Sequence, residues 1–337
     1  MNDRYIRQVL FSKIGKQGQK KLLASSVAII GCGALGSVIA NNLTRAGVGK
    51  IRIVDRDFVE LDNLQRQILF DEEDARKSIP KAIAAVEKLK RINSTISLEA
   101  KVYDVNPTNI EEIIDGADIV LDGTDNMETR FLINDACVKN NMPWVYGAAI
   151  GATGLTMNII PGKTPCFRCV IAKLPPAGAL PTCETTGVLN TITNIIASME
   201  TSEAIKMLIG NESINRNLIY FDAWNLSFDK IEIKRDKNCP TCVKKEFSVL
   251  NAEETSWAAV LCGRDAVQIR PPKQTKISLE NLGQQLAKVG KVTHKGYVLF
   301  FNVNSYELII FPDARAIIKG TADTSIARSL YAKYIGI

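Results

Sequence analysis

The segment GCGALG, residues 31–36, constrains the fold more than any other part of the chain. It follows SVAII, a run typical of a buried strand, and leads into VIANNLTRAG, which has helical spacing. Gly31, Gly33 and Gly36 fit the G-x-G-x-x-G turn, in which backbone N–H groups approach a phosphate at a helix N-terminus. The alternative is a tight strand-to-helix turn without a ligand.

Strand and helix signals alternate after this turn. IRIVDRDFVE, ISLEAKVYDV, ADIVLDGTDN and PWVYGAAIG have the composition of strands, and KAIAAVEKLKRIN has helical spacing. This alternation predicts an α/β, Rossmann-like, doubly wound and mostly parallel sheet with helices on both faces. After Gly154 the strands become more closely spaced, which predicts an antiparallel extension, and a long apolar helix ends at Gly210.

A chain of 337 residues exceeds one typical compact core. We expect a large domain over residues 1–246 and a small α/β domain over residues 247–337. We find no uninterrupted apolar run of the roughly 18 residues that a membrane helix needs, and the N-terminus does not look like a secretory signal. We therefore expect a cytoplasmic protein with no membrane partner.

The charge of +6 is mild and forms no long basic run, so nucleic acid is not an expected partner. His294 is the only histidine and lies in KVTHKG near the C-terminus. Catalysis by a Ser-His-Asp or Cys-His arrangement in the large domain is thereby excluded. We expect His294 to be a solvent-facing loop residue.

Two C-x-x-C pairs predict a metal site. Four thiolates are the ligands that structural zinc prefers, and the candidates are Cys166, Cys169, Cys239 and Cys242. The pairs are too far apart in sequence for a short zinc ribbon, so the metal would fasten the end of the large domain to its middle. Redox dithiols are the alternative interpretation.

The other cysteines divide into two kinds. We expect Cys32, Cys137 and Cys262 to be buried apolar residues. Cys183 lies in a loop rich in Pro and Gly, next to the predicted helix start, where a lowered pKa could make it a nucleophile. An inert loop cysteine is the other interpretation.

Charged residues follow several of the predicted strands. Asp55 is in position to accept hydrogen bonds from a ribose. Arg66 and Lys81 would supply cations that suit a triphosphate better than a nicotinamide dinucleotide, and Asp125 would be an oxygen ligand for Mg²⁺. Each could also be a surface ion pair or a helix cap. The pattern favours ATP without excluding a dinucleotide.

The ordered motifs RYIRQ, GCGALG, DRD, DNLQRQILF, IPK, GTDN, CFRC, PTCETTG and CPTC, within residues 3–245, resemble the ThiF/MoeB family, bacterial relatives of ubiquitin-activating enzymes. This resemblance implies ATP-dependent adenylation of the C-terminal Gly-Gly carboxylate of a ubiquitin-like sulfur carrier protein, with release of pyrophosphate. The pathway would be molybdopterin synthesis, thiamine synthesis or tRNA thiolation. A sulfurtransferase is a possible further partner.

The resemblance also implies residue roles. It assigns the phosphate turn to Gly31, Gly33 and Ala34, the ribose side to Asp55 with Asp57 beside it, the phosphate contacts to Asn63, Arg66 and Lys81, and the Mg²⁺ and nucleotide edge to Asp125 and Asn126. Arg7 matches an arginine that the family donates across a homodimer interface to the ATP of the other subunit. Cys183 matches a thiol implicated in thioester or acyl-disulfide chemistry with the carrier.

Two features depart from the family pattern. Ala34 replaces a glycine, which a tight turn tolerates only with a negative φ. The last ~90 residues are absent from minimal family members, and we expect them to support carrier docking or dimerisation. Two other functions stay open from the sequence: a NAD-dependent oxidoreductase with a structural zinc, and an inactive scaffold that binds the carrier.

Overall fold

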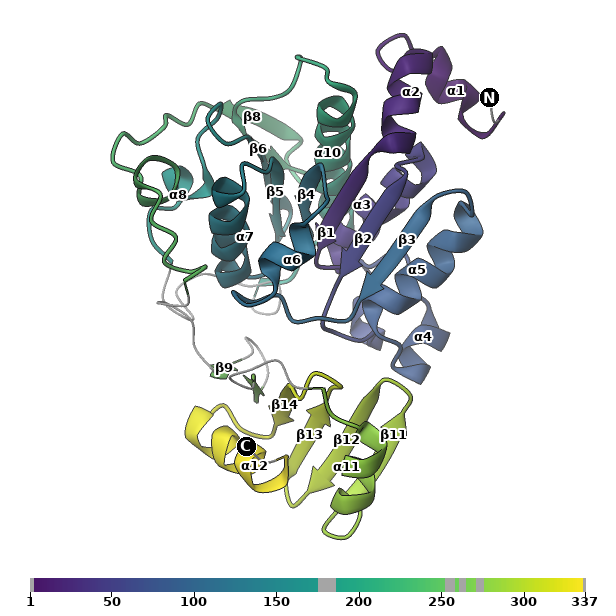
Figure 1. Ribbon diagram of the computed structural model, residues 1–337, viewed down its shortest axis with the longest axis vertical. Coiled ribbons are helices and arrows are strands. Elements are labelled where there is room, and N and C mark those ends of the chain that lie inside the picture. Colours follow the sequence, from purple (N-terminus) through teal and green to yellow (C-terminus); the bar gives the residue numbers. More distant parts are fainter. Residues whose placement is uncertain (1–2, 175–185, 252–257, 261–264, 271–275, 336–337) are drawn as a thin grey trace. The chain divides into compact units, whose positions relative to one another are not determined.

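The computed structural model describes residues 3–174, 186–251, 258–260, 265–270 and 276–335. The chain forms two compact units, Met1–Glu254 and Thr255–Ile337 (Figure 1). The sequence places this boundary between residues 246 and 247, and the structure divides the chain a little later.

The first unit is built on a sheet of eight described strands in the order β3-β2-β1-β4-β5-β6-β7-β8. Neighbours from β3 to β5 are parallel, and those from β5 to β8 are antiparallel. The predicted Rossmann-like sheet with an antiparallel extension is thus confirmed. The strands are β1 (Ser26–Ile30), β2 (Lys50–Val54), β3 (Ser97–Lys101), β4 (Ile119–Asp122), β5 (Trp144–Ile150), β6 (Thr153–Ile159), β7 (Leu218–Asp222) and β8 (Ser227–Ile231).

Helices cover both faces of this sheet because the side chains of each central strand alternate between two apolar cores. Val27 and Ile29 of β1 face the core formed with α3, α5 and α10, whereas Ala28 and Ile30 face the core formed with α6 and α7. The described helical segments of this unit are η1 (Asp3–Tyr5), α1 (Ile6–Leu10), α2 (Gly15–Ala24), α3 (Ala34–Ala46), η2 (Leu61–Asn63), α4 (Glu72–Lys77), α5 (Lys81–Ile92), α6 (Ile110–Ile114), α7 (Met127–Lys139), α8 (Phe167–Val170), α10 (Asn190–Ile209) and η3 (Pro240–Lys244).

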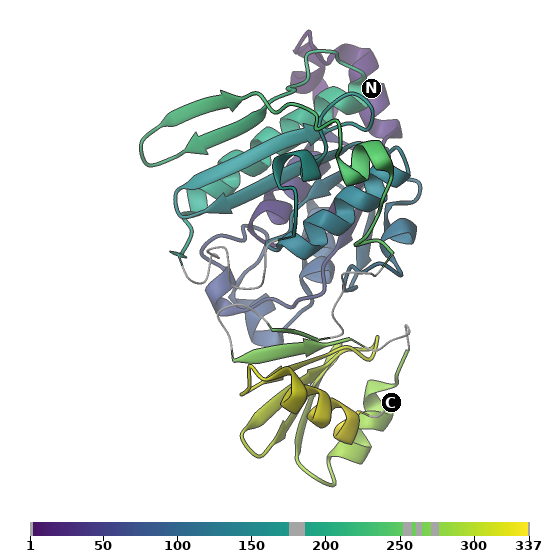
Figure 2. The same ribbon diagram turned by 90° about the vertical axis from the view of Figure 1, so that its left-hand side faces the viewer.

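The change from parallel to antiparallel pairing follows from a short connection. Only Gly151 and Ala152 separate β5 from β6, and so short a link joins antiparallel strands, whereas a parallel crossover needs a dozen residues or more. The β7–β8 hairpin continues this part of the sheet, and Figure 2 shows it projecting from the unit. All five residues of β8 are exposed.

The second unit has an antiparallel sheet in the order β11-β12-β13-β14-β10-β9, and its own core with Phe301, Leu308 and Ile318. His294 is exposed, but it lies in β11 rather than in the predicted loop, because Lys291–Lys295 pairs with β12. The elements are β9 (Ala258–Val260), β10 (Ala266–Ile269), α11 (Leu279–Leu286), β11 (Lys291–Lys295), β12 (Val298–Val303), β13 (Tyr306–Ile310), β14 (Ala316–Lys319) and α12 (Thr324–Tyr334).

The topology of the first unit locates the candidate site. The order of the parallel strands reverses between β1 and β4, and ligands of such sheets bind beyond the carboxyl ends of the strands at this reversal. The glycine turn follows β1 and the GTDN segment follows β4, so both lie at this edge. None of the helices in the described part of the chain is long and apolar enough to cross a membrane.

Candidate active site

The glycine turn after β1 packs directly on the loop after β4. A Cβ atom at Gly31, where φ is +89°, would lie 2.5 Å from the carbonyl oxygen of Gly123, and one at Gly36 would lie 1.9 Å from the carbonyl oxygen of Gly31. Both positions therefore require glycine. Ala34 is the first residue of α3 and has no positive φ, so its methyl group is tolerated.

Asp55 holds this turn in place. Its Oδ2 accepts a hydrogen bond from the backbone N–H of Cys32 at 2.6 Å, and its Oδ1 accepts one from the backbone N–H of Asp57 at 2.7 Å. Burial raises the pKa of Asp55, and the nearby Lys81 opposes this effect. The predicted ribose ligand thus lies beside the turn, with both carboxylate oxygens bonded to backbone.

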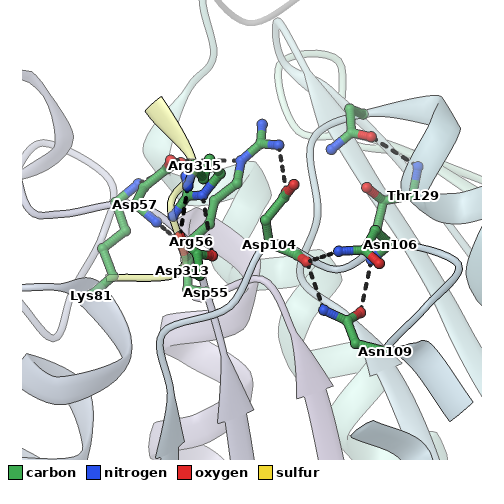
Figure 3. A network of polar contacts seen from close by, with 11 residues as sticks. Asp55, Arg56, Asp57, Lys81, Asp104, Asn106, Asn109, Thr129, Asp313 and Arg315 are labelled. Carbon is green, nitrogen blue, oxygen red and sulfur yellow. Dashed lines mark hydrogen bonds and ion pairs between the residues drawn. The ribbon is translucent and has the colours of Figure 1, made fainter. Parts of the chain in front are cut away.

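Lys81 is a buried cation at the first position of α5. It is 8% exposed, and its Nζ lies 3.8 Å from Oδ2 of Asp57 (Figure 3). Burial lowers its pKa, but the carboxylates of Asp57, Asp55 and Asp125 outweigh burial and raise the pKa above the usual value. The fold therefore brings residues from the ends of β2 and β4 and the start of α5 into one charged cluster.

An arginine that the sequence analysis did not assign belongs to the same edge. Arg56 stands between Asp55 and Asp57 in DRD, and its Nη1 lies 2.9 Å from Oδ1 of Asp104 (Figure 3). The carbonyl of Asp104 accepts hydrogen bonds from the side chains of Asn106 and Asn109, each at 2.9 Å. The only signal for Arg56 in the sequence was its place between two candidate acids.

A buried ion pair shapes the loop that carries Asp125. Asp122, at the end of β4, accepts hydrogen bonds from the N–H and the hydroxyl of Thr124 at 2.9 and 2.6 Å, and pairs with Nε of Arg130 at 2.9 Å. Nη2 of Arg130 donates in turn to the carbonyl of Thr124 at 2.7 Å. Asp125 comes directly after the segment that these contacts hold. Its side chain is exposed and could contact a ligand. Neither partner of this ion pair is among the residues predicted from the sequence.

Three residues predicted to contact the nucleotide form their described hydrogen bonds with residues close to them in the sequence. Asn126 caps α7, accepting from the N–H of Thr129 at 2.9 Å. The Asn63 side chain donates to Oδ1 of Asp62 at 2.9 Å, and Nη1 of Arg66 donates to the Asp62 carbonyl at 2.7 Å. No described contact joins Arg66 to the Lys81 cluster. The residue of this segment that lies against the glycine turn is Gln67, which the sequence analysis did not single out.

Helix α1, which carries Arg7, lies at the opposite end of the sheet from the glycine turn (Figure 1). Arg4, just before Arg7, donates a hydrogen bond to the carbonyl of Ile92, the last residue of α5. Gln8, just after it, donates a hydrogen bond to the carbonyl of Ala46, the last residue of α3. Helices α3 and α5 both start at the candidate site, and α3 alone is about 20 Å long at 1.5 Å per residue. Arg7 therefore cannot reach the turn of its own chain.

The four patterned cysteines form one cluster. Their Sγ atoms all lie within 4.8 Å of one another, with distances of 3.5, 3.7 and 3.9 Å between Cys166 and Cys239, Cys169 and Cys242, and Cys166 and Cys169. Sulfurs bound tetrahedrally at the usual zinc–sulfur distance are about 3.8 Å apart. The cluster could therefore hold a metal ion, and the fold joins two pairs that are distant in the sequence.

Helix α7 supports both cysteine turns. Its Asn134 accepts a hydrogen bond from the N–H of Phe167 at 2.9 Å. The buried Asp135 accepts from the Thr241 hydroxyl at 2.9 Å and lies 3.7 Å from Nε of Arg168. Burial raises the pKa of Asp135, while Arg168 acts in the opposite direction. Helix α7, which Asn126 caps, thus also fixes the geometry of the candidate metal site.

The remaining cysteines agree with expectation where they are described. Cys32 and Cys137 are fully buried, and burial raises the pKa of each thiol. Cys183 and Cys262 lie outside the described residues.

Comparison with known proteins gives the family. The ThiF family model matches residues 5–241, more than half of the chain. The chain belongs to the ThiF family. The family resemblance predicted from the motifs is thereby confirmed.

Three curated relatives show how far the similarity to this ThiF family member extends. The sulfur carrier protein ThiS adenylyltransferase of Bacillus subtilis is 43% identical, with coverage of 100% of this chain and 100% of the relative. The SAMP-activating enzyme E1 of Haloferax volcanii is 34% identical, with coverage of 71% of this chain and 88% of the relative. The sulfur carrier protein adenylyltransferase of Thermus thermophilus is 36% identical, with coverage of 71% and 90%.

Among solved structures, Escherichia coli MccB with ATP matches with a TM-score of 0.63 at 24% identity, covering 72% of this ThiF family chain and 75% of that chain. At this identity the match shows a common fold and no more.

Proposed function

We propose that the chain uses ATP to adenylate the C-terminal Gly-Gly carboxylate of a ubiquitin-like sulfur carrier protein, with release of pyrophosphate. The observation that carries this proposal is the buried Lys81 cation among Asp55, Asp57 and Asp125, beside a glycine turn at the N-terminus of a helix. The adenylyltransferase relatives support it. The relative that is similar over the whole chain, including the second unit, favours a ThiS-type carrier.

The chemistry suits the residues at this edge of the sheet. A carboxylate oxygen of the terminal glycine attacks the α-phosphorus of ATP, and the bond from that phosphorus to its bridging oxygen breaks as pyrophosphate leaves. An α-carboxyl group has a pKa of about 3.5 and is already ionised at neutral pH. The reaction therefore needs no general base, in agreement with a first unit that contains no histidine. Its main demand is stabilisation of phosphate charge.

The proposed roles follow from this demand. The glycine turn and the N-terminus of α3 bind phosphate, Asp55 binds the ribose, and Lys81 and Arg66 balance the charge of the phosphates. Asp125 would hold Mg²⁺, which neutralises phosphate charge when bound. The four-cysteine cluster would hold structural Zn²⁺, whose contribution is to fasten α8 to η3.

We also propose a homodimer in which Arg7 acts on the ATP of the partner subunit. The distance of α1 from the glycine turn of the same chain supports this role, because only a second chain could bring Arg7 there. Ile6, Leu10 and Phe11 are half or more exposed around Arg7, which would suit a surface that a partner covers. Covalent chemistry at Cys183 and delivery of sulfur by a sulfurtransferase stay predictions, as does a cytoplasmic location.

ATP–pyrophosphate exchange that depends on a carrier ending in Gly-Gly tests the proposal. We expect exchange with the wild-type chain, and its loss in Arg66→Ala with the metal content unchanged. Arg76→Ala, in which an exposed arginine of α4 is removed, is the matched control and should exchange normally. Binding of NAD without exchange would favour an oxidoreductase, and carrier binding without exchange would favour an inactive scaffold; either result contradicts the proposal.

A further inference from the structure

Gln67 is a buried side chain whose amide oxygen has no hydrogen-bond partner in the described part of the chain. The residue is 4% exposed, and Oε1 makes no hydrogen bond to any described residue. Its backbone is fixed, since its N–H donates to the carbonyl of Asn63 at 3.0 Å and its carbonyl accepts from the N–H of Phe70 at 3.2 Å. A buried polar atom without a partner costs about 1–3 kcal/mol. An apolar side chain of the same length would fill this space at lower cost.

The amide nitrogen of Gln67 lies at the start of α3. Its Nε2 is 3.9 Å from the position that a Cβ atom would take at Gly33, the N-cap of this helix. The first N–H groups of a helix have no carbonyl partner within the helix, and together with the helix dipole they favour an anion. The side-chain donor of Gln67 therefore stands beside a set of backbone donors suited to phosphate.

We infer that Gln67 is a nucleotide-binding residue whose side-chain NH₂ donates to a phosphate oxygen of ATP at the N-terminus of α3. This inference rests on the proposed function and adds a contact to it. Because the amide is uncharged, it directs the phosphate by geometry rather than by charge, in contrast to Lys81. Its position beside Gly33 assigns it to the phosphate nearest the glycine turn.

Gln67→Met separates this role from a structural one, because methionine keeps the length of the side chain and removes both polar atoms. We expect the affinity of the full-length chain for Mg·ATP, measured by titration calorimetry, to fall about tenfold. The Tm should stay the same or rise, because the unpartnered Oε1 is gone. A structural role for the amide predicts the reverse pattern, a clear loss of Tm with little specific loss of ATP affinity.

Two further variants complete the test. Gln67→Glu keeps an oxygen acceptor, loses the donor and adds a negative charge, so it should bind ATP more weakly than Gln67→Met. Gln65→Met changes an exposed glutamine two residues away and should match the wild type in affinity and Tm. Wild-type affinity in Gln67→Met, or unfolding that accounts for the loss, overturns the inference.

The outcomes also separate this inference from the proposed function. If the wild-type chain binds ATP but shows no exchange that depends on a carrier, the proposed function fails and the affinities of the Gln67 variants still decide the role of Gln67. If the wild-type chain binds no ATP, both fall. If exchange is normal and Gln67→Met binds ATP as tightly as the wild type, only the assignment of Gln67 is wrong.

Discussion

The carboxylate of Asp55 accepts a hydrogen bond of 2.6 Å from the backbone N–H of Cys32. This contact joins the end of β2 to the glycine turn after β1, so the conformation of the turn depends on a side chain from the neighbouring strand. Behind the turn, the main chain of Gly123 leaves no room for a side chain at Gly31. The glycine turn is therefore held by residues that follow two strands, β2 and β4.

Gly31→Ala tests how tightly the turn is held, and Gly116→Ala is its matched control. Both glycines have positive φ, +89° and +70°, but a Cβ atom at Gly116 meets nothing within 4 Å whereas one at Gly31 meets the Gly123 carbonyl at 2.5 Å. Gly116→Ala should lose about 1–2 kcal/mol of stability, the cost of a left-handed alanine, and bind ATP normally. Gly31→Ala should lose more stability and lose ATP binding, measured by urea denaturation and calorimetry. Equal losses in the two variants would show that the close contact is unimportant.

Mixing Arg7→Ala with Lys81→Met tests whether Arg7 acts across a dimer. Each variant alone should be inactive in exchange. Random reassortment of equal amounts makes half of the dimers mixed, and in each of these one site keeps its own Lys81 and receives an intact Arg7 from the partner. We therefore expect recovery of about one quarter of wild-type exchange. Lack of recovery, with mixed dimers shown to form by native mass spectrometry, would contradict action in trans.

Cys239→Ser tests the four-cysteine cluster. We expect bound zinc, measured by elemental analysis, to fall from about one ion per chain and the Tm to drop, because tetrahedral zinc needs all four thiolates. Cys137→Ala changes a buried cysteine outside the cluster and should keep its metal. Full metal content in Cys239→Ser would mean that the ion binds elsewhere.

We expect Glu200→Gln to stabilise the folded protein, and we expect this gain in stability to increase with pH. Glu200 is fully buried on α10, and neither of its carboxylate oxygens has a hydrogen-bond partner among the described residues. Burial and the nearby Asp122 raise the pKa of Glu200 well above its usual value, although Arg130 acts in the opposite direction. In the unfolded chain the group ionises near pH 4.3. The stability it contributes is thus complete below that pH and is lost as the pH rises toward the folded pKa. The advantage of Gln over Glu should grow by about 1.4 kcal/mol per pH unit in this window.

Urea denaturation from pH 4 to pH 8 measures this difference. Glu212→Gln, at an exposed position, is the control and should show no such trend. A constant difference between Glu200→Gln and the wild type over this range would mean that Glu200 is ionised in the folded protein.

Local signals in the sequence predicted the architecture of the first unit. Apolar runs and helical spacing predicted the alternation of strands and helices, and Gly210 ends α10 in the left-handed conformation as expected. A misassigned element, the strand around His294, has a single apolar residue, Val292, which is half-buried against the core of the second unit, so alternation of apolar and polar residues does not reveal the strand. It is a strand because β12 pairs with it.

The site could be predicted only in part, because its charges depend on contacts between distant segments. Asp57 and Lys81 are close because β2 ends and α5 begins at the same edge of the sheet. Asn63 and Arg66 match a motif, yet their described hydrogen bonds stay within their own loop. Gln67 lies in the same motif and was passed over, since only the packed structure reveals that it is buried against the start of α3.

The sequence by itself determined what local geometry and ligand chemistry require: glycine where the turn after β1 meets another main chain, and two C-x-x-C pairs with the thiolates that zinc prefers. The tertiary structure decided which of the matching residues act together. The pairing of Asp122 with Arg130, the support of both cysteine turns by Asp135, and the buried state of Lys81 and Glu200 all arise from packing. Burial and the proximity of charges are properties of the folded chain, because both depend on residues that are distant in sequence.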